Sequence, residues 1–556
     1  KEISQNFSIL KYEPQLWRMG ACRPTIDGTI VGFEKKGKDT YALIDTSDVH
    51  TLMIAAAGTG KTTFFLEPNI EYCCAAGMSF ISTDTKGDIY RNCGYVAAKR
   101  YGYKISVIDL RNPLKSDGFN LLHLVKKYMD EHKNNPLNIS AKAKSERYAK
   151  IVADSIIAAD GDKYGANTYF YDAAKGLIAA LILIIAEYGN DKECHIVSVL
   201  KLMIELLEAK PQKKSQLKSE TYFADLIKLL PPEHKARWLS GAAINNADQA
   251  ALSVISTALS RLNSLIDTET EQILCFNTAI DTETLCKEKC AVFIVLPEED
   301  RTKYVIANLI IEQISREIYH IADENGGHLD KRIMIYFEEF GTMPPISGVE
   351  AMFSALRSRS VSIVAIIQSF AQLEKNYGKQ GSEIIVDNTQ LMLFGGFAPG
   401  SSSAEKLSKD LGKQTILTGS ISKGNGGKNS GHQSQQLQMT GRELITADEL
   451  KCLPKGTFIC TKTGMSPFKV QLLFYEKLGI RYDEKLNAEI KEVKTVYYAD
   501  RKSISKVIKK QHIDEQENEM NKEENVSDIN ELITDYSLEE DDIFTETPSS
   551  KKMIRT

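Results

Sequence analysis

Short, continuous apolar runs, each followed by a stretch of helical periodicity, occur in two separate parts of the chain. In the first part the predicted strands are 51–57, 78–84 and 104–110. In the second part they are 290–297, 332–337, 362–368 and 391–397, with a helix predicted over 304–321. Short apolar runs bounded by turns are typical of buried strands, and strands that alternate with helices pair in parallel. The pattern therefore predicts an α/β fold.

The strand pattern disappears between the two parts. Long amphipathic stretches replace it at 141–159, 171–188, 197–209 and 248–266. We therefore expect one α/β domain, formed by 1–121 and 286–498, that is split by an all-helical domain at 122–285. The most apolar stretch, Gly176–Ala186, is shorter than the roughly 20 residues that span a bilayer, which predicts a buried core helix.

Two further segments have no apolar period. Residues 418–440 are rich in Gly, Ser, Asn and Gln, which predicts a mobile loop. Its Lys423, Lys428 and His432 make it either a DNA-contacting loop or an ordinary surface loop. Residues 499–556 form an acidic tail that we expect to be disordered, because a run of carboxylates with few apolar residues cannot offset its ordering entropy. The tail either solubilises the protein or docks a basic partner.

Composition and charge change this picture little. Apolar residues make up 42% and charged residues 26% of the chain, as in ordinary soluble globular proteins. The net charge is −5, so any DNA contact has to come from local basic patches or from charge focused inside a ring of subunits. Cys286 and Cys290 stand at a metal-ligand spacing, but no second pair completes a zinc site, and reduced thiols are the simpler interpretation.

The segment from Ala55 to Thr62 matches a phosphate-binding loop, except that Ala55 replaces the leading glycine. A buried strand precedes it and a helix follows it, so backbone N–H groups and the helix N-terminus point at the phosphates. Lys61 is expected to bridge the β- and γ-phosphates of ATP, and the Thr62 hydroxyl to bind Mg²⁺. The residues predicted to bind the nucleotide are Ala57, Gly58, Thr59, Gly60, Lys61, Thr62 and Thr63.

Two adjacent carboxylates, Glu338 and Glu339, follow the apolar strand 333–337 directly. An ATPase of this kind needs an acidic group at the end of a second strand, to hold the Mg²⁺ shell and to activate the attacking water. We predict that Glu338 belongs to the metal shell and that Glu339 is the general base.

Three polar residues further along are weaker candidates. Gln368 ends the next buried strand, where its amide could sense the γ-phosphate or be an ordinary strand-end residue. Arg357 and Arg359 follow a predicted helix at 348–356. An arginine there could reach a neighbouring subunit's ATP site and stabilise transition-state charge, or simply lie on the surface.

Together these motifs resemble the type IV secretion coupling proteins of the TraG/TraD kind, the ATPases of conjugation systems. The resemblance runs over 49–467 and starts from the phosphate-binding loop. It includes TDTKGD (83–88), which is similar to the family's D-P-K-G-E. The other matching segments are FNLL (119–122), STALSRL (256–262), FEEFGTMPPI (337–346), IIQSFAQL (366–373) and GRELITADEL (441–450).

The resemblance implies a hexameric, RecA/FtsK-like motor with ATP and Mg²⁺ at the subunit interface and a helical domain inserted in the nucleotide-binding domain. It implies that Arg357 acts in trans and that Gln368 is the family's third motif. Members usually begin with two transmembrane helices; because this chain begins at Lys1, we expect it to be the soluble cytoplasmic portion of an inner-membrane protein. The implied partners are DNA with its bound relaxase and the components of the secretion channel.

This chain departs from the family pattern at Ala55, at Glu338 in place of Asp, and at Thr85 in place of Pro. Three functions remain open. The first is an ATPase that translocates DNA into a secretion channel. The second is a nucleotide-gated receptor or scaffold for secretion substrates with little DNA-driven turnover. The third, a chromosome translocase of the FtsK type, has no reason to carry the helical insertion.

Overall fold

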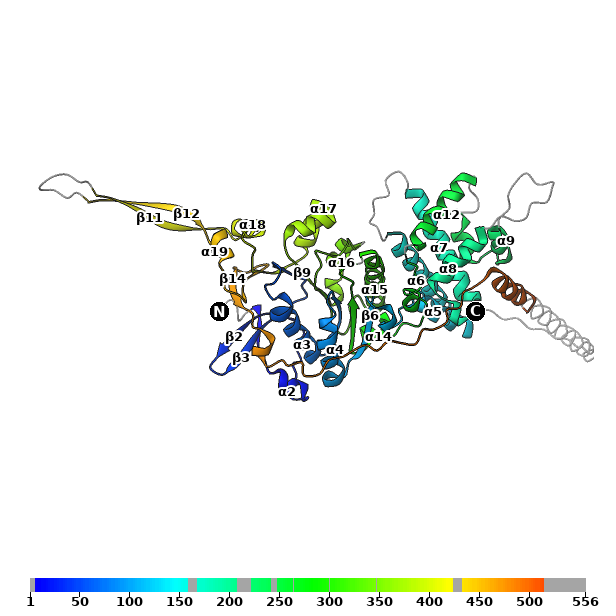
Figure 1. The fold of residues 1–556 in the computed structure, drawn as a ribbon. Coiled ribbons are helices and arrows are strands. Elements are labelled where there is room, and N and C mark those ends of the chain that lie inside the picture. The colour runs from blue at the N-terminus through cyan, green and yellow to red at the C-terminus, as the bar shows by residue number, and fades with distance from the viewer. Residues whose placement is uncertain are drawn as a thin grey trace, which may run out of the picture.

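The computed structural model describes residues 6–158, 168–207, 222–241, 248–263, 265–299, 301–346, 348–423 and 433–514. Its centre is a nine-stranded sheet in the order β14-β13-β10-β4-β9-β8-β5-β7-β6. The seven strands from β10 to β6 run parallel to their neighbours, and β13 and β14 are antiparallel. The α/β fold predicted from the apolar runs is confirmed (Figure 1).

All seven predicted strands are present, within a few residues of their expected ends. They are β4 (Thr51–Ala55), β5 (Ser79–Asp84), β6 (Lys104–Asp109), β7 (Cys290–Val295), β8 (Ile333–Phe337), β9 (Val361–Ile367) and β10 (Leu391–Gly395). The two antiparallel strands, β13 (Thr457–Lys462) and β14 (Phe468–Gln471), were not predicted.

The parallel strands are apolar on both faces because helices cover both faces of the sheet. Along β4, for example, Leu52 and Ile54 belong to one buried cluster, and Met53 and Ala55 belong to another. Figure 1 shows α3 (Glu67–Ala76) and α4 (Asp88–Tyr101) on one side of the sheet. On the other side it shows α15 (Tyr304–Glu324), α16 (Val349–Ala355) and α17 (Phe370–Asp387). The sheet is therefore buried between two apolar clusters, one on each face.

The chain between β6 and β7 forms the helical domain at one end of the molecule (Figure 1). No strand occurs among its described residues. Its main helices are α5 (His123–Asn134), α6 (Ile139–Ala158), α7 (Thr168–Tyr188), α8 (Ile196–Leu207), α9 (Tyr222–Leu229), α10 (Lys235–Leu239) and α12 (Asp248–Asn263). Within the described part of the chain, α7 is the single helix that is long and apolar enough to cross a membrane. Its residues from Leu177 to Ala186 are all buried, so α7 is the core helix of this domain, as the sequence predicts.

A three-stranded antiparallel sheet near the start of the chain was not predicted. It consists of β1 (Ser8–Lys11), β2 (Thr29–Lys36) and β3 (Asp39–Asp45), in the order β1-β3-β2. The buried apolar side chains of β2 and β3 belong to the same cluster as those of α3 and α4. The small sheet therefore extends the core on that side of the large sheet.

The segment 418–440 was predicted to be a mobile loop, and this prediction was wrong for its described part. The strands β11 (Lys413–Lys423) and β12 (Gln433–Glu443) pair along eleven positions to form a hairpin. Figure 1 shows this hairpin projecting from the end of the molecule opposite the helical domain. Lys423 ends β11, and Lys428 and His432 lie outside the described residues. Backbone pairing stabilises this hairpin without an alternating apolar pattern.

The predicted disordered tail at 499–556 also differs from the structure at its start. Residues 501–514 form a helix, and residues 515–556 lie outside the described residues. The chain reaches this helix from the sheet through an extended segment that Figure 1 shows running beneath the molecule to the helical domain. The Leu486 N–H donates to the Arg91 carbonyl (2.8 Å), and the Ala499 N–H donates to the Ser198 hydroxyl (3.1 Å). This segment therefore ties the nucleotide-binding domain to the helical domain.

Candidate nucleotide-binding site

The phosphate-binding loop leaves the carboxyl end of β4, in the middle of the sheet. Gly58 and Gly60 have φ values of +75° and +86°, in the left-handed region that glycine adopts without strain. Ala55 is the last residue of β4 and is not among the residues with positive φ, so its side chain causes no strain there. The Ala56 N–H donates to the Gly396 carbonyl (3.1 Å), which anchors the loop to the neighbouring strand β10. The substitution of the leading glycine is therefore compatible with a phosphate-binding loop.

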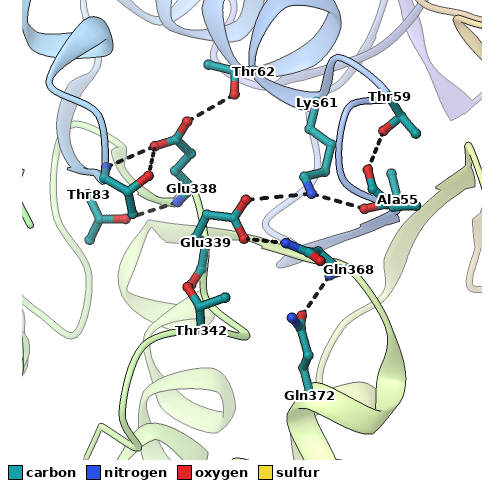
Figure 2. A network of polar contacts seen from close by, with 12 residues as sticks. Ala55, Thr59, Lys61, Thr62, Thr83, Glu338, Glu339, Thr342, Gln368 and Gln372 are labelled. Carbon is teal, nitrogen blue, oxygen red and sulfur yellow. Dashed lines mark hydrogen bonds and ion pairs between the residues drawn. The ribbon is translucent and has the colours of Figure 1, made fainter. Parts of the chain in front are cut away.

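The helix that follows the loop begins with one π-helical turn, η1 (Thr62–Leu66), and continues as α3. The Lys61 and Thr62 side chains point toward the acidic strand end (Figure 2). The hydroxyls of Thr59 and Thr63 instead donate to carbonyls of the loop, Ala56 at 2.8 Å and Gly60 at 3.2 Å. These two residues shape the loop, while Lys61 and Thr62 present their polar groups to the site.

Glu338 directly follows β8, and its carboxylate lies against Thr62 of the phosphate-binding loop. One carboxylate oxygen accepts from the Thr62 hydroxyl at 3.0 Å. The other accepts from the Thr85 N–H (3.1 Å) and hydroxyl (3.3 Å), and the Glu338 N–H donates to the Thr83 hydroxyl (3.0 Å). Figure 2 shows this carboxylate between the Thr62 hydroxyl and the chain that carries Thr83. Thr62 and Glu338 thus form a paired hydroxyl and carboxylate of the kind that holds Mg²⁺ beside phosphates.

Burial raises the pKa of the Glu338 carboxyl, and repulsion from Asp84 raises it further. Glu338 is only 5% exposed. Asp84 cannot move away, because its oxygens accept from the N–H groups of Lys86, Gly87 and Tyr90, at the start of α4. A cation bound by Thr62 and Glu338 would offset both effects, because it favours the ionised carboxylate.

We expect Mg²⁺-dependent activity to fall at acidic pH because of Glu338. Its raised pKa means that protonation begins above the usual glutamate range, and a protonated carboxyl cannot hold the cation. Apparent Mg²⁺ affinity should therefore increase with pH through the raised pKa and then level off. Titrating ATP hydrolysis with Mg²⁺ at several pH values measures this. Glu338→Gln should bind Mg²⁺ weakly with no such pH dependence, and an equally steep dependence in that variant would contradict the assignment.

Glu339 lies beside Lys61 and Gln368, at the centre of the view in Figure 2. One Glu339 oxygen is 3.7 Å from the Lys61 ammonium, and the other accepts from the Gln368 side-chain amide at 3.3 Å. The ammonium also donates to the Ala55 carbonyl (3.1 Å). Burial lowers the pKa of Lys61, and the attraction of Glu339 and Glu338 opposes this shift. The structure thus brings Lys61, Glu339 and Gln368 together around one point.

Arg357 lies near the amino end of β9, on the side of the sheet opposite the carboxyl ends that carry the site. It precedes β9, whereas Gln368 follows β9, and six residue steps along a strand span about 20 Å. The exposed Arg357 guanidinium donates to the Gln390 side chain (3.1 Å), just before β10. It therefore cannot reach the phosphate-binding loop of its own subunit. Arg359 is engaged elsewhere, with Asp323 at 3.1 Å.

Residues 18–503 match the family model described as "Type IV secretory system Conjugative DNA transfer". The chain belongs to this family. It is a type IV coupling protein of conjugation, as the sequence motifs indicated. No curated protein sequence matches the chain.

Solved structures of a conjugative coupling protein share the fold of this chain. The structure described as "Bacterial conjugative coupling protein TrwBdeltaN70", in an unbound monoclinic form, is 14% identical with a TM-score of 0.56. The similarity covers 87% of this chain and 96% of that one. The "Plasmid coupling protein TrwB in complex with ADP and Mg2+" is 13% identical with a TM-score of 0.55, over 87% and 97% of the two chains. This likeness confirms the P-loop fold with its helical domain.

Thr85 is a site residue whose role the sequence did not reveal. It was noted only as a departure from the family's D-P-K-G-E pattern. A proline has neither a backbone N–H nor a hydroxyl, so it could make neither of the hydrogen bonds that Thr85 donates to Glu338. Glu338 is itself longer than the aspartate usual in the conjugative DNA transfer family. The two departures thus occur in residues that contact each other, and the longer carboxylate receives the additional donors.

Proposed function

We propose that this chain is an ATP-hydrolysing coupling protein that recruits DNA, as a relaxase–DNA complex, and translocates it into a type IV secretion channel. The observation that carries the proposal is the meeting of Lys61 and Thr62, after β4, with Glu338 and Glu339, after β8, in a member of the conjugative DNA transfer family. That arrangement provides for binding a nucleotide, for holding a cation and for activating a water molecule.

ATP and Mg²⁺ are the proposed ligands. The N–H groups of residues 57–63 and the Lys61 ammonium would hold the phosphates, while Thr62 and Glu338 would hold the cation. The complexes of the related TrwB with ADP and Mg²⁺, and with a non-hydrolysable ATP analogue, support this choice. The bound cation would neutralise charge that develops on the phosphates. Glu339 would take a proton from the attacking water, oriented by Gln368.

We propose a homo-hexamer, the assembly that the family resemblance implies, and the position of Arg357 supports it. An arginine about 20 Å from its own phosphate-binding loop can stabilise the transition state only in a neighbouring subunit, which a head-to-tail ring provides. We place the ring at the cytoplasmic face of the inner membrane, beside the secretion-channel components.

The test is ATP hydrolysis with and without DNA, in the wild-type protein and in Lys61→Ala. A DNA-stimulated rate that is lost in the variant supports a motor. A rate that is indifferent to DNA would favour the alternative of a nucleotide-gated receptor for secretion substrates. No hydrolysis in either protein would reject the enzyme altogether.

A further inference from the structure

The first turns of α17 lie against the loop 338–346, which follows β8 and carries Glu339. Three side chains of this helix make the contact: Gln372 lies against Gly341, and Asn376 and Tyr377 hydrogen-bond to the loop backbone. Residues four apart on a helix lie on the same face, so Gln372 and Asn376 approach the loop from one side. The loop 338–346 is therefore packed against α17.

Gln372 connects this helix to Gln368. The Gln368 backbone N–H donates to the Gln372 side-chain oxygen at 2.9 Å. The Gln368 side-chain amide donates to Glu339 at 3.3 Å. Figure 2 shows Gln372 rising from its helix to Gln368, on the side away from Lys61. Gln368 is thus held at its backbone by Gln372 and contacts the proposed general base with its side chain.

Gly341 is the position where Gln372 meets the Glu339 loop. A Cβ atom placed on Gly341 would lie 2.1 Å from the Gln372 side-chain oxygen and 2.9 Å from its Cβ. Both separations are far shorter than a van der Waals contact. Any residue larger than glycine would therefore displace the Gln372 side chain, and with it the hydrogen bond to Gln368.

The remaining contacts fix the backbone of the loop. The Asn376 amide donates to the Met343 carbonyl at 2.8 Å. The Ile346 N–H donates to the Tyr377 hydroxyl at 3.2 Å, and the Tyr377 ring stacks on Phe340 with the centroids 5.6 Å apart. The helix breaks directly afterwards, at Gly378, whose φ is +70°. The part of α17 that contacts the loop is therefore a short unit that ends at this break.

We propose that Gln372 is a positioning residue for ATP hydrolysis, which holds Gln368 and the Glu339 loop in a fixed position relative to each other. The inference rests on the proposed function, since it concerns the same reaction. A group that activates water must be held within a fraction of an ångström, and a misplacement of about 1 Å can cost about 100-fold in rate. A shift of Gln368 in response to the γ-phosphate would move the first turns of α17 and the loop 338–346 together.

Four variants of the full chain test this proposal. Gln372→Met keeps the length of the side chain and removes the strong acceptor, whereas Gln372→Glu keeps an acceptor. Gly341→Ala displaces Gln372 without changing it, and Gln380→Ala, an exposed glutamine beyond the break, is the control. We expect Gln372→Met and Gly341→Ala to lower kcat for ATP about 10- to 100-fold with KM within about twofold. Gln372→Glu should retain most of the rate, and Gln380→Ala all of it.

Hydrogen exchange at the Gln368 backbone amide supplies a readout that does not need activity. Its rate should rise about tenfold or more in Gln372→Met and stay near the wild-type rate in Gln372→Glu. A wild-type kcat in Gln372→Met, an effect on KM alone, or unchanged exchange would overturn the proposal. A wild-type protein that hydrolyses no ATP would overturn the proposed function instead, and the exchange rates would still decide whether Gln372 holds Gln368.

Discussion

Glu339→Gln should lower kcat for ATP hydrolysis by about 10²- to 10⁴-fold, the range that a general base contributes. The substitution changes one oxygen to an amide and keeps the shape of the side chain, so the loop after β8 should stay in place. It removes the negative charge that lies 3.7 Å from the Lys61 ammonium. Lys61 would then be free to bind phosphate, and we expect KM for ATP to be unchanged or lower.

Single-turnover hydrolysis and equilibrium binding of a labelled ATP analogue measure these two quantities separately. Glu374→Gln is the matched control, because Glu374 is an exposed glutamate on α17 outside the site. Hydrolysis at the wild-type rate in Glu339→Gln would show that another group activates the water. A loss of ATP binding would show that Glu339 has a structural role.

Arg357→Ala should lower the ATPase rate of the assembled protein by about 10³- to 10⁵-fold, the range found for arginines that act in trans. The physical reason is that Arg357 lies near the amino end of β9, whereas its own phosphate-binding loop lies at the carboxyl ends of the strands. Nucleotide affinity should change little, because the arginine would stabilise charge that develops in the transition state. Arg359 lies two residues further on in the same turn. The Arg359→Ala variant should lose the contact with Asp323 and keep most of its activity.

Mixed assemblies test the trans action of Arg357 directly. Arg357→Ala and Lys61→Ala are each expected to be inactive alone. In a mixture, some interfaces combine an intact Lys61 from one subunit with an intact Arg357 from the next, so activity should reappear. A mixture as inactive as its components, or an Arg357→Ala assembly with a normal rate, would remove the assignment.

The parts of the site that could be predicted from the sequence lie in short segments at the ends of buried strands. The phosphate-binding loop after β4, Glu338 and Glu339 after β8, and Gln368 after β9 all belong to this class. Parallel strands bring such segments to one edge of the sheet, so their proximity follows from the strand pattern. The roles of Thr85 and Gln372 could not be predicted this way, because each depends on which side chain of another element lies opposite.

Two of the elements that the sequence did not reveal lack a strong apolar period or lie beside a dominant composition. The hairpin β11–β12 is exposed along much of its length, and its strands are held by backbone pairing rather than by a buried face. The helix 501–514 stands directly before the acidic run, and the composition of that run led to a prediction of disorder for the whole of 499–556. Its signal was present in Ile504 and Ile508, four residues apart and both 1% exposed.

The central claim is that the site around Lys61 and Glu339 hydrolyses ATP in order to move DNA. The most direct measurement is the steady-state ATPase rate as a function of DNA concentration, for the wild-type protein and for Lys61→Ala. The account predicts a wild-type rate that rises with DNA and saturates, and a variant that stays at background throughout. A wild-type rate that is the same with and without DNA would contradict it.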